Sequence, residues 1–132
     1  FCKKFFYSSQ NIERNLNSQE HLIVDARAKE RFEGKVAEPR EGIRSGHIPS
    51  SVNLPFSDLS HDGCLLAKNI LKEKFNAINS ENKPMVMSCG SGVTACVLAL
   101  TAEMSGYKHV KVYDGSWSEW GAGDYFPVVV TQ

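Results

Sequence analysis

The feature that most constrains this 132-residue chain is a short apolar run that ends in a glycine-rich loop and leads into a helical pattern. Residues 85–88 are mostly apolar, residues 89–92 read Cys-Gly-Ser-Gly, and residues 93–105 have a continuous helical composition closed by Gly106. This order predicts a buried strand, a tight loop and a helix. The two glycines let the loop fold so tightly that successive N–H groups can point inward and bind an anion.

An alternation of strand-like and helix-like segments along the whole chain predicts an α/β fold. The expected strands cover residues 22–25, 52–54, 85–88 and 110–113. The expected helices cover residues 9–16, 65–75 and 93–105, with a short helix around Trp117 and Trp120. Such alternation implies a central parallel sheet with helices on both faces, and ligands then bind at the carboxyl ends of the strands, where Cys89 lies. Repeated glycines and prolines between residues 34 and 55 predict a long ordered loop.

Composition argues against several classes of partner. Fifteen basic and fifteen acidic residues cancel, so charge gives no reason to expect nucleic acid or an anionic membrane. The chain is 42% apolar, which suits one compact domain, and its longest apolar runs fall far short of the ~20 residues of a membrane span. Its cysteines (Cys2, Cys64, Cys89 and Cys96) form no Cys-x-x-C pair and have no histidine at zinc-site spacing, so no metal is expected. Reduced thiols favour a cytoplasmic protein, with the mitochondrion as the alternative.

Cys89 is the candidate nucleophile. The loop N–H groups and the positive end of a helix beginning near Val93 both favour a thiolate, because helix N-termini lower a cysteine pKa from ~8.5 to roughly 3.5–7.5. The alternative is a cysteine that merely packs at a strand end, as many unpaired cysteines do. The flanking glycines favour the nucleophile. Cys96, two turns further along the helix, is expected to be a buried small apolar residue, too distant for a disulfide with Cys89.

Residues 89–95 resemble the active-site loop of the 3-mercaptopyruvate sulfurtransferases, a branch of the rhodanese superfamily. Further segments match the C-terminal domain of that family in the same order: residues 25–27, 31–32, 38–40, 46–49 with Asn53, and 114–121. The resemblance implies a rhodanese-like α/β fold, with the active-site loop between a central strand and the following helix. Residues 1–132 would form a single rhodanese domain, with a linker and first helix up to about residue 20 and a core over residues 22–127. The N-terminal rhodanese domain of the full-length family lies outside this chain.

The resemblance also implies a set of site residues. Cys89 and Ser91 would be catalytic, and Ser91 would belong to a Ser-His-Asp relay whose His and Asp come from the N-terminal domain. Arg31 and Arg40 would bind the substrate carboxylate, which a planar guanidinium grips with two parallel hydrogen bonds. The remaining substrate-binding residues are in the loop and the first turn of the helix: Gly90, Gly92, Val93 and Thr94.

The implied activity is transfer of sulfur from 3-mercaptopyruvate to a thiol, such as thioredoxin, or to cyanide, through a Cys89 persulfide and without a cofactor. Thiosulfate-using relatives resemble Cys-Arg-Lys-Gly in the loop, whereas this chain has Gly90 and Ser91 in place of the two cations. Rhodanese-like phosphatases resemble a longer loop closed by an arginine, and Ala95 occupies that position here. Two alternatives remain: a thiosulfate sulfurtransferase, and a non-catalytic rhodanese module that binds or regulates.

Other conspicuous side chains are expected to be structural. An internal pair of Asp25 and Arg27 that braces the long loop is favoured over a catalytic role. His47 resembles a residue that fixes this loop, and that interpretation is favoured over a general base. Trp117 and Trp120 could wall a pocket, but core packing is favoured for residues of this size.

Overall fold

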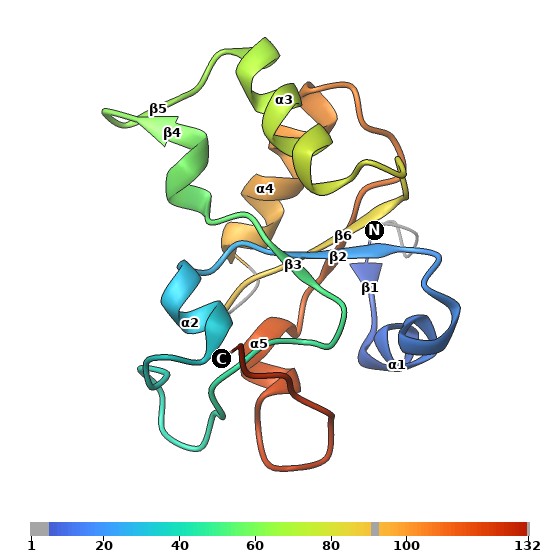
Figure 1. Cartoon of the computed structure of the whole chain (residues 1–132), viewed down its shortest axis with the longest axis vertical. Coiled ribbons are helices and arrows are strands. Elements are labelled where there is room, and N and C mark those ends of the chain that lie inside the picture. Colours follow the sequence, from blue (N-terminus) through green and yellow to red (C-terminus); the bar gives the residue numbers. More distant parts are fainter. Residues whose placement is uncertain (1–5, 91–92, 132) are drawn as a thin grey trace.

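The computed structural model describes residues 6–90 and 93–131, in which helices cover both faces of a parallel sheet (Figure 1). The sheet has strand order β1-β7-β6-β2-β3 and consists of β1 (Phe6–Tyr7), β2 (Leu22–Asp25), β3 (Val52–Asn53), β6 (Met85–Ser88) and β7 (Lys111–Tyr113). The helices are α1 (Ser9–Ser18), α2 (Lys29–Glu33), α3 (Lys68–Ile78), α4 (Val93–Met104) and α5 (Ser116–Trp120), with a 3-10 turn η1 (Phe56–Leu59). This arrangement confirms the predicted fold class. No helix in the described ranges is long and apolar enough to cross a membrane.

Successive residues of the central strands face opposite helical layers, as the pleat of a strand requires. Val24, Met87 and Val112 pack beneath α3 and α4, which contribute Leu71, Phe75, Leu98 and Ala102. On the other face Ile23, Val86 and Tyr113 pack against α1 and α5 through Ile12, Trp117 and Trp120. Both faces of the sheet are therefore covered by apolar side chains, and the central strands are buried between them.

The carboxyl edge of the sheet contains a topological switch point. β2 pairs with β3 on one side and with β6 on the other, and β6 pairs in turn with β7. The segments that follow β2 and β6 therefore diverge from one point, where open α/β sheets bind their ligands. Cys89 follows β6 there, and Arg27 lies just beyond the end of β2.

The first folded elements precede the core predicted to begin at residue 22. Helix α1 was expected over residues 9–16 and extends to Ser18; the Ser8 hydroxyl accepts the Asn11 N–H, and the Asn11 side chain accepts the Ser8 N–H in return. Strand β1 was not predicted because its two residues are too few to show an alternation, and it is held by pairing with β7. Helix α2, also unpredicted, has five residues and no buried one, so it shows no apolar period.

The helix predicted over residues 65–75 begins later than expected. Residues 60–65 form a hairpin of β4 (Ser60–His61) and β5 (Cys64–Leu65), joined by Asp62 and Gly63 with φ of 50° and 79°. Positive φ at both turn residues is the requirement of a type I′ hairpin, which Asp-Gly favours. Helix α3 then starts at Lys68, and it buries Leu71 rather than Ile70, which is 40% exposed.

The long loop between residues 34 and 55 is ordered, as predicted, and the C-terminal segment is hydrogen-bonded along it. His47 and Val129 exchange backbone hydrogen bonds of 2.9 and 3.0 Å, and the Thr131 N–H donates to the Glu33 carbonyl at 2.9 Å. Gly46 has φ of 124°, and a Cβ there would lie 2.5 Å from the Val129 carbonyl oxygen. The backbone at this crossing thus requires glycine both for its conformation and for space.

Candidate active site

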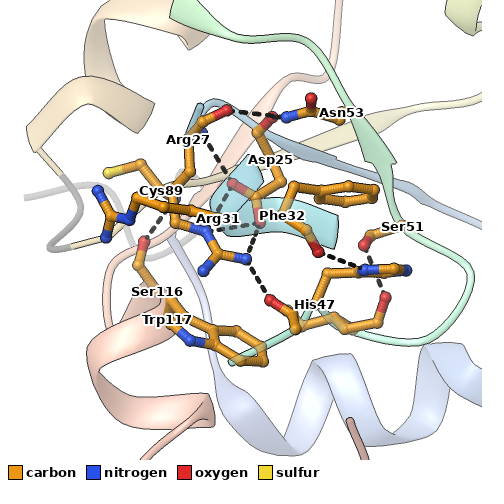
Figure 2. Close-up of polar contacts among 12 residues, drawn as sticks. Asp25, Arg27, Arg31, Phe32, His47, Ser51, Asn53, Cys89, Ser116 and Trp117 are labelled. Carbon is orange, nitrogen blue, oxygen red and sulfur yellow. Dashed lines mark hydrogen bonds and ion pairs between the residues drawn. The ribbon is translucent and has the colours of Figure 1, made fainter. Parts of the chain in front are cut away.

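Cys89 lies where β6 ends, and helix α5 fixes the backbone on either side of it (Figure 2). The Cys89 N–H donates to the Ser116 hydroxyl at 3.1 Å, and that hydroxyl donates to the Tyr113 carbonyl at 2.8 Å. The Cys89 carbonyl accepts the Trp117 N–H at 2.8 Å, and the Gly90 carbonyl accepts the Ser118 N–H at 2.9 Å. The start of the loop is therefore attached to a helix whose two tryptophans are buried in the core.

The sulfur of Cys89 faces the start of helix α4. Its Sγ accepts the N–H of Ala95 at 3.3 Å, and the residue is 3% exposed. An N–H in the first turn of a helix, with the positive end of that helix behind it, stabilises a thiolate over a thiol. Ser91 and Gly92 lie outside the described residues, as does the side chain of Val93, so their predicted roles stay predictions.

A small cavity of about 260 Å³ opens beside Cys89. It brings together the predicted residues Arg31, Arg40, Gly90 and Thr94. The other lining residues are Glu38, Pro39, Ile43 and Ser118. Two arginines against one glutamate leave one positive charge in the cavity besides the charge of Cys89 itself, so the arginines can attract an anion to the sulfur.

Arg31 is held in this cavity by Glu38. The Nε of Arg31 donates to Oε2 of Glu38 at 3.1 Å and its Nη2 donates to Oε1 at 2.7 Å, a forked pair in which the Glu38 side chain is 3% exposed and that of Arg31 is 31% exposed. The hydrogen bond that Arg31 donates to Glu38 raises the pKa of Arg31, and the negative charges of Glu38, Asp25 and Cys89 add to that effect. Arg31 is thus a fixed cation close to the sulfur. The sequence placed Glu38 in a family segment but gave no signal that it would be the partner of Arg31.

Arg27 belongs to the same charge network but is fully buried. Its Nε donates to Oδ1 and Oδ2 of Asp25 at 3.1 and 3.0 Å, and its Nη2 donates to Oδ2 of Asp25 at 2.8 Å and to the Gly46 carbonyl at 2.6 Å (Figure 2). Its guanidinium lies 4.5 Å from the ring centroid of Trp117, and Nη1 is 3.4 Å from Glu38. The predicted internal pair that braces the loop is confirmed.

Residues 8–122 match the sequence profile of the rhodanese-like domain. The chain belongs to the rhodanese-like family. Human 3-mercaptopyruvate sulfurtransferase is 45% identical over 118 residues, which cover 88% of this chain and 40% of the human protein. An Arabidopsis thaliana thiosulfate/3-mercaptopyruvate sulfurtransferase, described as mitochondrial, is 42% identical over 131 residues, 97% of this chain and 34% of that protein. The sulfur transferase subunit of yeast mitochondrial complex I superposes with a TM-score of 0.85 at 32% identity, covering 98% of this chain and 47% of that one. This rhodanese-like domain therefore spans less than half the length of these relatives.

His47 and the two tryptophans have the structural positions expected of them in the domain. Nδ1 of His47 is 2.7 Å from the Phe32 carbonyl, and the two rings stack with centroids 3.9 Å apart. These contacts fix the loop to helix α2. Trp117 and Trp120 are buried, and their Nε1 atoms donate to the carbonyls of Arg44 and Pro127. Core packing, rather than a pocket wall, is confirmed for both.

The prediction that Cys96 is buried was wrong. Helix α4 faces the sheet with Ala95, Leu98, Ala99 and Ala102, so the 100° step from Ala95 turns Cys96 outward. The outer face of α4 is nevertheless apolar: Val97, Leu100 and Met104 are exposed there, with Leu100 57% exposed. Because α4 is apolar on nearly every side, its sequence could not show which face the sheet would cover.

A second, larger cavity lies away from Cys89, at the amino ends of β6 and β7. Its volume is about 490 Å³, and Lys72, Lys83, Lys108 and His109 contribute to its lining. The described residues that line it include neither a cysteine nor a carboxylate. Within the described ranges, no group of three His, Cys, Asp or Glu side chains is placed to hold a metal ion. The smaller cavity, with a nucleophile and two arginines, is the better candidate for chemistry.

Proposed function

We propose that this domain is the catalytic domain of a 3-mercaptopyruvate sulfurtransferase and that Cys89 carries the transferred sulfur as a persulfide. The observation that carries the proposal is the position of Cys89 Sγ. It accepts a helical N–H from Ala95 and borders a small cavity shared with Arg31 and Arg40. This combines a stabilised thiolate with cations for an anionic donor.

The first step is attack of the Cys89 thiolate on the sulfur of 3-mercaptopyruvate. A new S–S bond forms and the C–S bond breaks, with its electron pair passing to carbon as the enolate of pyruvate. The proton of the substrate thiol ends on that carbon, so thiolate and mercaptopyruvate give a persulfide anion and pyruvate. Resemblance to the family gives Ser91 the handling of this proton, together with a His and an Asp of an N-terminal domain.

The second step regenerates the enzyme. The thiolate of an acceptor, such as thioredoxin, or cyanide attacks the outer sulfur and releases the Cys89 thiolate. Both steps exchange sulfur between nucleophiles and need neither a metal nor an organic cofactor. The backbone N–H of Ala95, which donates to Cys89 Sγ, would stabilise the persulfide as well.

Arg31 and Arg40 would orient the donor through its carboxylate. Arg31 keeps part of its guanidinium exposed to the cavity, while Arg40 is exposed and has no ion pair among the described residues. A carboxylate could therefore bridge the two cations without displacing an existing partner of Arg40. Because cations at loop residues 90 and 91 would suit a thiosulfate dianion, Gly90 and Ser91 favour mercaptopyruvate as the donor.

A companion N-terminal rhodanese domain would complete the site. Relatives more than twice as long as this chain, and the apolar outer face of α4 next to the loop, support such a partner. In the two-domain protein, Leu100→Asp should then increase hydrogen exchange along α4 relative to the unsubstituted protein. An unchanged exchange rate there would mean that the companion domain lies elsewhere.

The test of the proposed function is mass spectrometry of the protein after incubation with a sulfur donor. Mercaptopyruvate should add one sulfur to Cys89, and dithiothreitol should remove it and release the sulfur. Thiosulfate should load far more slowly. Equal loading by the two donors would favour the thiosulfate alternative, and no loading by either would favour a non-catalytic rhodanese module.

A further inference from the structure

We infer that Glu38 and Gly90 act together as positioning residues for Arg31. Glu38 clamps the guanidinium of Arg31, and the guanidinium fits beside residue 90 because glycine has no side chain. A side chain at residue 90 therefore alters substrate choice by displacing Arg31, in addition to any charge that it adds. The inference deepens the proposed carboxylate recognition and rests on it.

The two contacts meet at one atom of Arg31. A Cβ on Gly90 would lie 3.1 Å from Nη2, and the same Nη2 donates to Glu38 at 2.7 Å. Favourable contacts between heavy atoms begin at about 3.5 Å, so Nη2 would have to shift by a few tenths of an ångström. That shift would strain the shorter of the two hydrogen bonds in the forked pair.

Neither side of this contact can withdraw easily. Glu38 is buried and also lies 3.4 Å from Nη1 of Arg27, so it cannot follow Arg31 without leaving a second cation. On the other side, the carbonyls of Cys89 and Gly90 are hydrogen-bonded to the backbone of α5. The loop and the clamp are therefore both fixed, and the guanidinium between them is what must yield.

The backbone of Gly90 does not itself demand glycine. Its φ lies outside the left-handed region in which L side chains are strained, and the contact with Arg31 is the only approach within 3.5 Å that a Cβ would make to the described atoms around it. Gly90→Ala should thus leave the fold unchanged and act on Arg31 alone. Arginine at residue 90, as in loops that resemble Cys-Arg-Lys-Gly, would add a cation but also displace the one already present.

A double-mutant cycle on Cys89 alkylation tests the inference without requiring turnover. Iodoacetate carries a carboxylate and iodoacetamide is its neutral analogue, so the ratio of their rates with Cys89 reports carboxylate recognition beside the sulfur. Arg31→Ala should lower this ratio by roughly tenfold, and Gly90→Ala by about threefold, since a charged hydrogen bond is lost in the first and weakened in the second. In the Arg31→Ala background, Gly90→Ala should change the ratio no further. An equal loss in both backgrounds, or no loss in either, would overturn the inference.

Glu38 is tested by the same ratio, with a control on the neighbouring helix. Glu38→Gln keeps the shape of the side chain but loses the charge, and it should lower the ratio about as much as Gly90→Ala does. Glu30→Gln removes a carboxylate from the exposed face of α2 and should leave the ratio unchanged. Equal effects of the two variants would contradict the clamp. If Glu38→Gln does not fold, the Gly90→Ala cycle still decides the matter.

Steady-state kinetics separate this inference from the proposed function. With mercaptopyruvate, Gly90→Ala should raise KM with little change in kcat, because binding rather than chemistry is disturbed. A protein that never turns over mercaptopyruvate but shows the predicted coupling in alkylation would refute the function and retain the positioning. Normal turnover of mercaptopyruvate without coupling between Gly90 and Arg31 in alkylation would support the function and refute the positioning.

Discussion

Arg27 and Arg31 follow the same strand and share the carboxylate of Glu38, yet their surroundings differ. Arg27 is 1% exposed and makes contacts with Asp25, the Gly46 carbonyl and the ring of Trp117. Arg31 is 31% exposed and has one forked partner, with the rest of its guanidinium toward the cavity beside Cys89. The first has its charge satisfied within the protein, whereas the second has capacity left for a ligand.

This difference teaches how to separate structural from functional charges in one network. A buried charge must be paired, so the partners of Arg27 are explained by folding alone. Arg31 is only half-buried, and its forked pair with Glu38 fixes it beside a nucleophile with part of its guanidinium open to a ligand. Substitutions near Arg27 should therefore change stability, and those near Arg31 should change chemistry.

The largest expected effect is on activity, and it comes from substitution of the nucleophile. Cys89→Ser should abolish sulfur loading and transfer, because a serine hydroxyl cannot form a persulfide, while the urea midpoint should stay within the range of a conservative substitution. Loading is measured by intact mass and transfer by release of pyruvate. Residual transfer in the serine variant would assign the chemistry to another cysteine.

Arg27→Ala should produce the largest loss of stability. Removing one partner of a buried pair leaves Asp25 uncompensated, which costs about 3–5 kcal/mol of the free energy of unfolding. Arg40→Ala is the matched control, because Arg40 is exposed and its loss should change stability by no more than about 0.5 kcal/mol. Urea denaturation of both variants makes the comparison, and similar losses would remove the distinction between the two kinds of arginine.

Arg31→Ala and Arg40→Ala should each lower kcat/KM for mercaptopyruvate by roughly ten- to a hundredfold, since a charged hydrogen bond contributes ~1.5–3 kcal/mol. Alkylation of Cys89 by neutral iodoacetamide should survive in both. Lysine should rescue only partly, because it keeps the charge but loses the planar fork. Unchanged kcat/KM would mean that both arginines are solvated surface residues with no role in binding the donor. A parallel loss of alkylation would mean that they support the thiolate instead.

The smallest expected effect is a difference in alkylation rate between Cys89 in the loop and Cys96 in helix α4. Partial burial raises the pKa of Cys96, and the negative charge of Asp114 adds to this, so less of its thiol is ionised at a given pH. At neutral pH Cys96 should alkylate about two- to tenfold more slowly than a cysteine in a peptide, and its rate should rise only above the ordinary thiol pKa. Cys89 should react first at mildly acidic pH. Peptide mapping after limited iodoacetamide treatment measures the order, and earlier reaction at Cys96 would contradict both assignments.

The sequence could predict those helices and strands that show a clear pattern of residues along the chain. The strand, loop and helix around Cys89 follow from a run of apolar residues, two glycines and a helical composition, and the sheet that they build follows from alternation. Elements without a period were missed: β1 has two residues, and α2 has five with none buried. The Asp62-Gly63 turn did carry a hairpin signal, but the apolar residues after it resembled the start of a helix.

The candidate site was predictable in its members but not in their connections. Cys89, Arg31 and Arg40 could be named from motifs, and the fold brings them to one cavity. Which carboxylate would pair with Arg31, and which hydroxyl would accept the Cys89 N–H, depends on contacts between segments far apart in the chain. Glu38 and Ser116 are polar residues like many others until the fold places them.

The bonds between Val129 and His47, and between Thr131 and Glu33, bear on where this protein can be cut. The loop that they hold also carries Glu38 and Arg40, while Cys89 is anchored independently by α5. A protease acting near Pro127 would leave Cys89 in place and remove two of the contacts that hold the loop with Glu38 and Arg40, the residues that govern what approaches the sulfur. Nicked protein should therefore still react with a small neutral reagent while it discriminates poorly between donors, and the ratio of those two activities would serve as a purity assay for intact preparations.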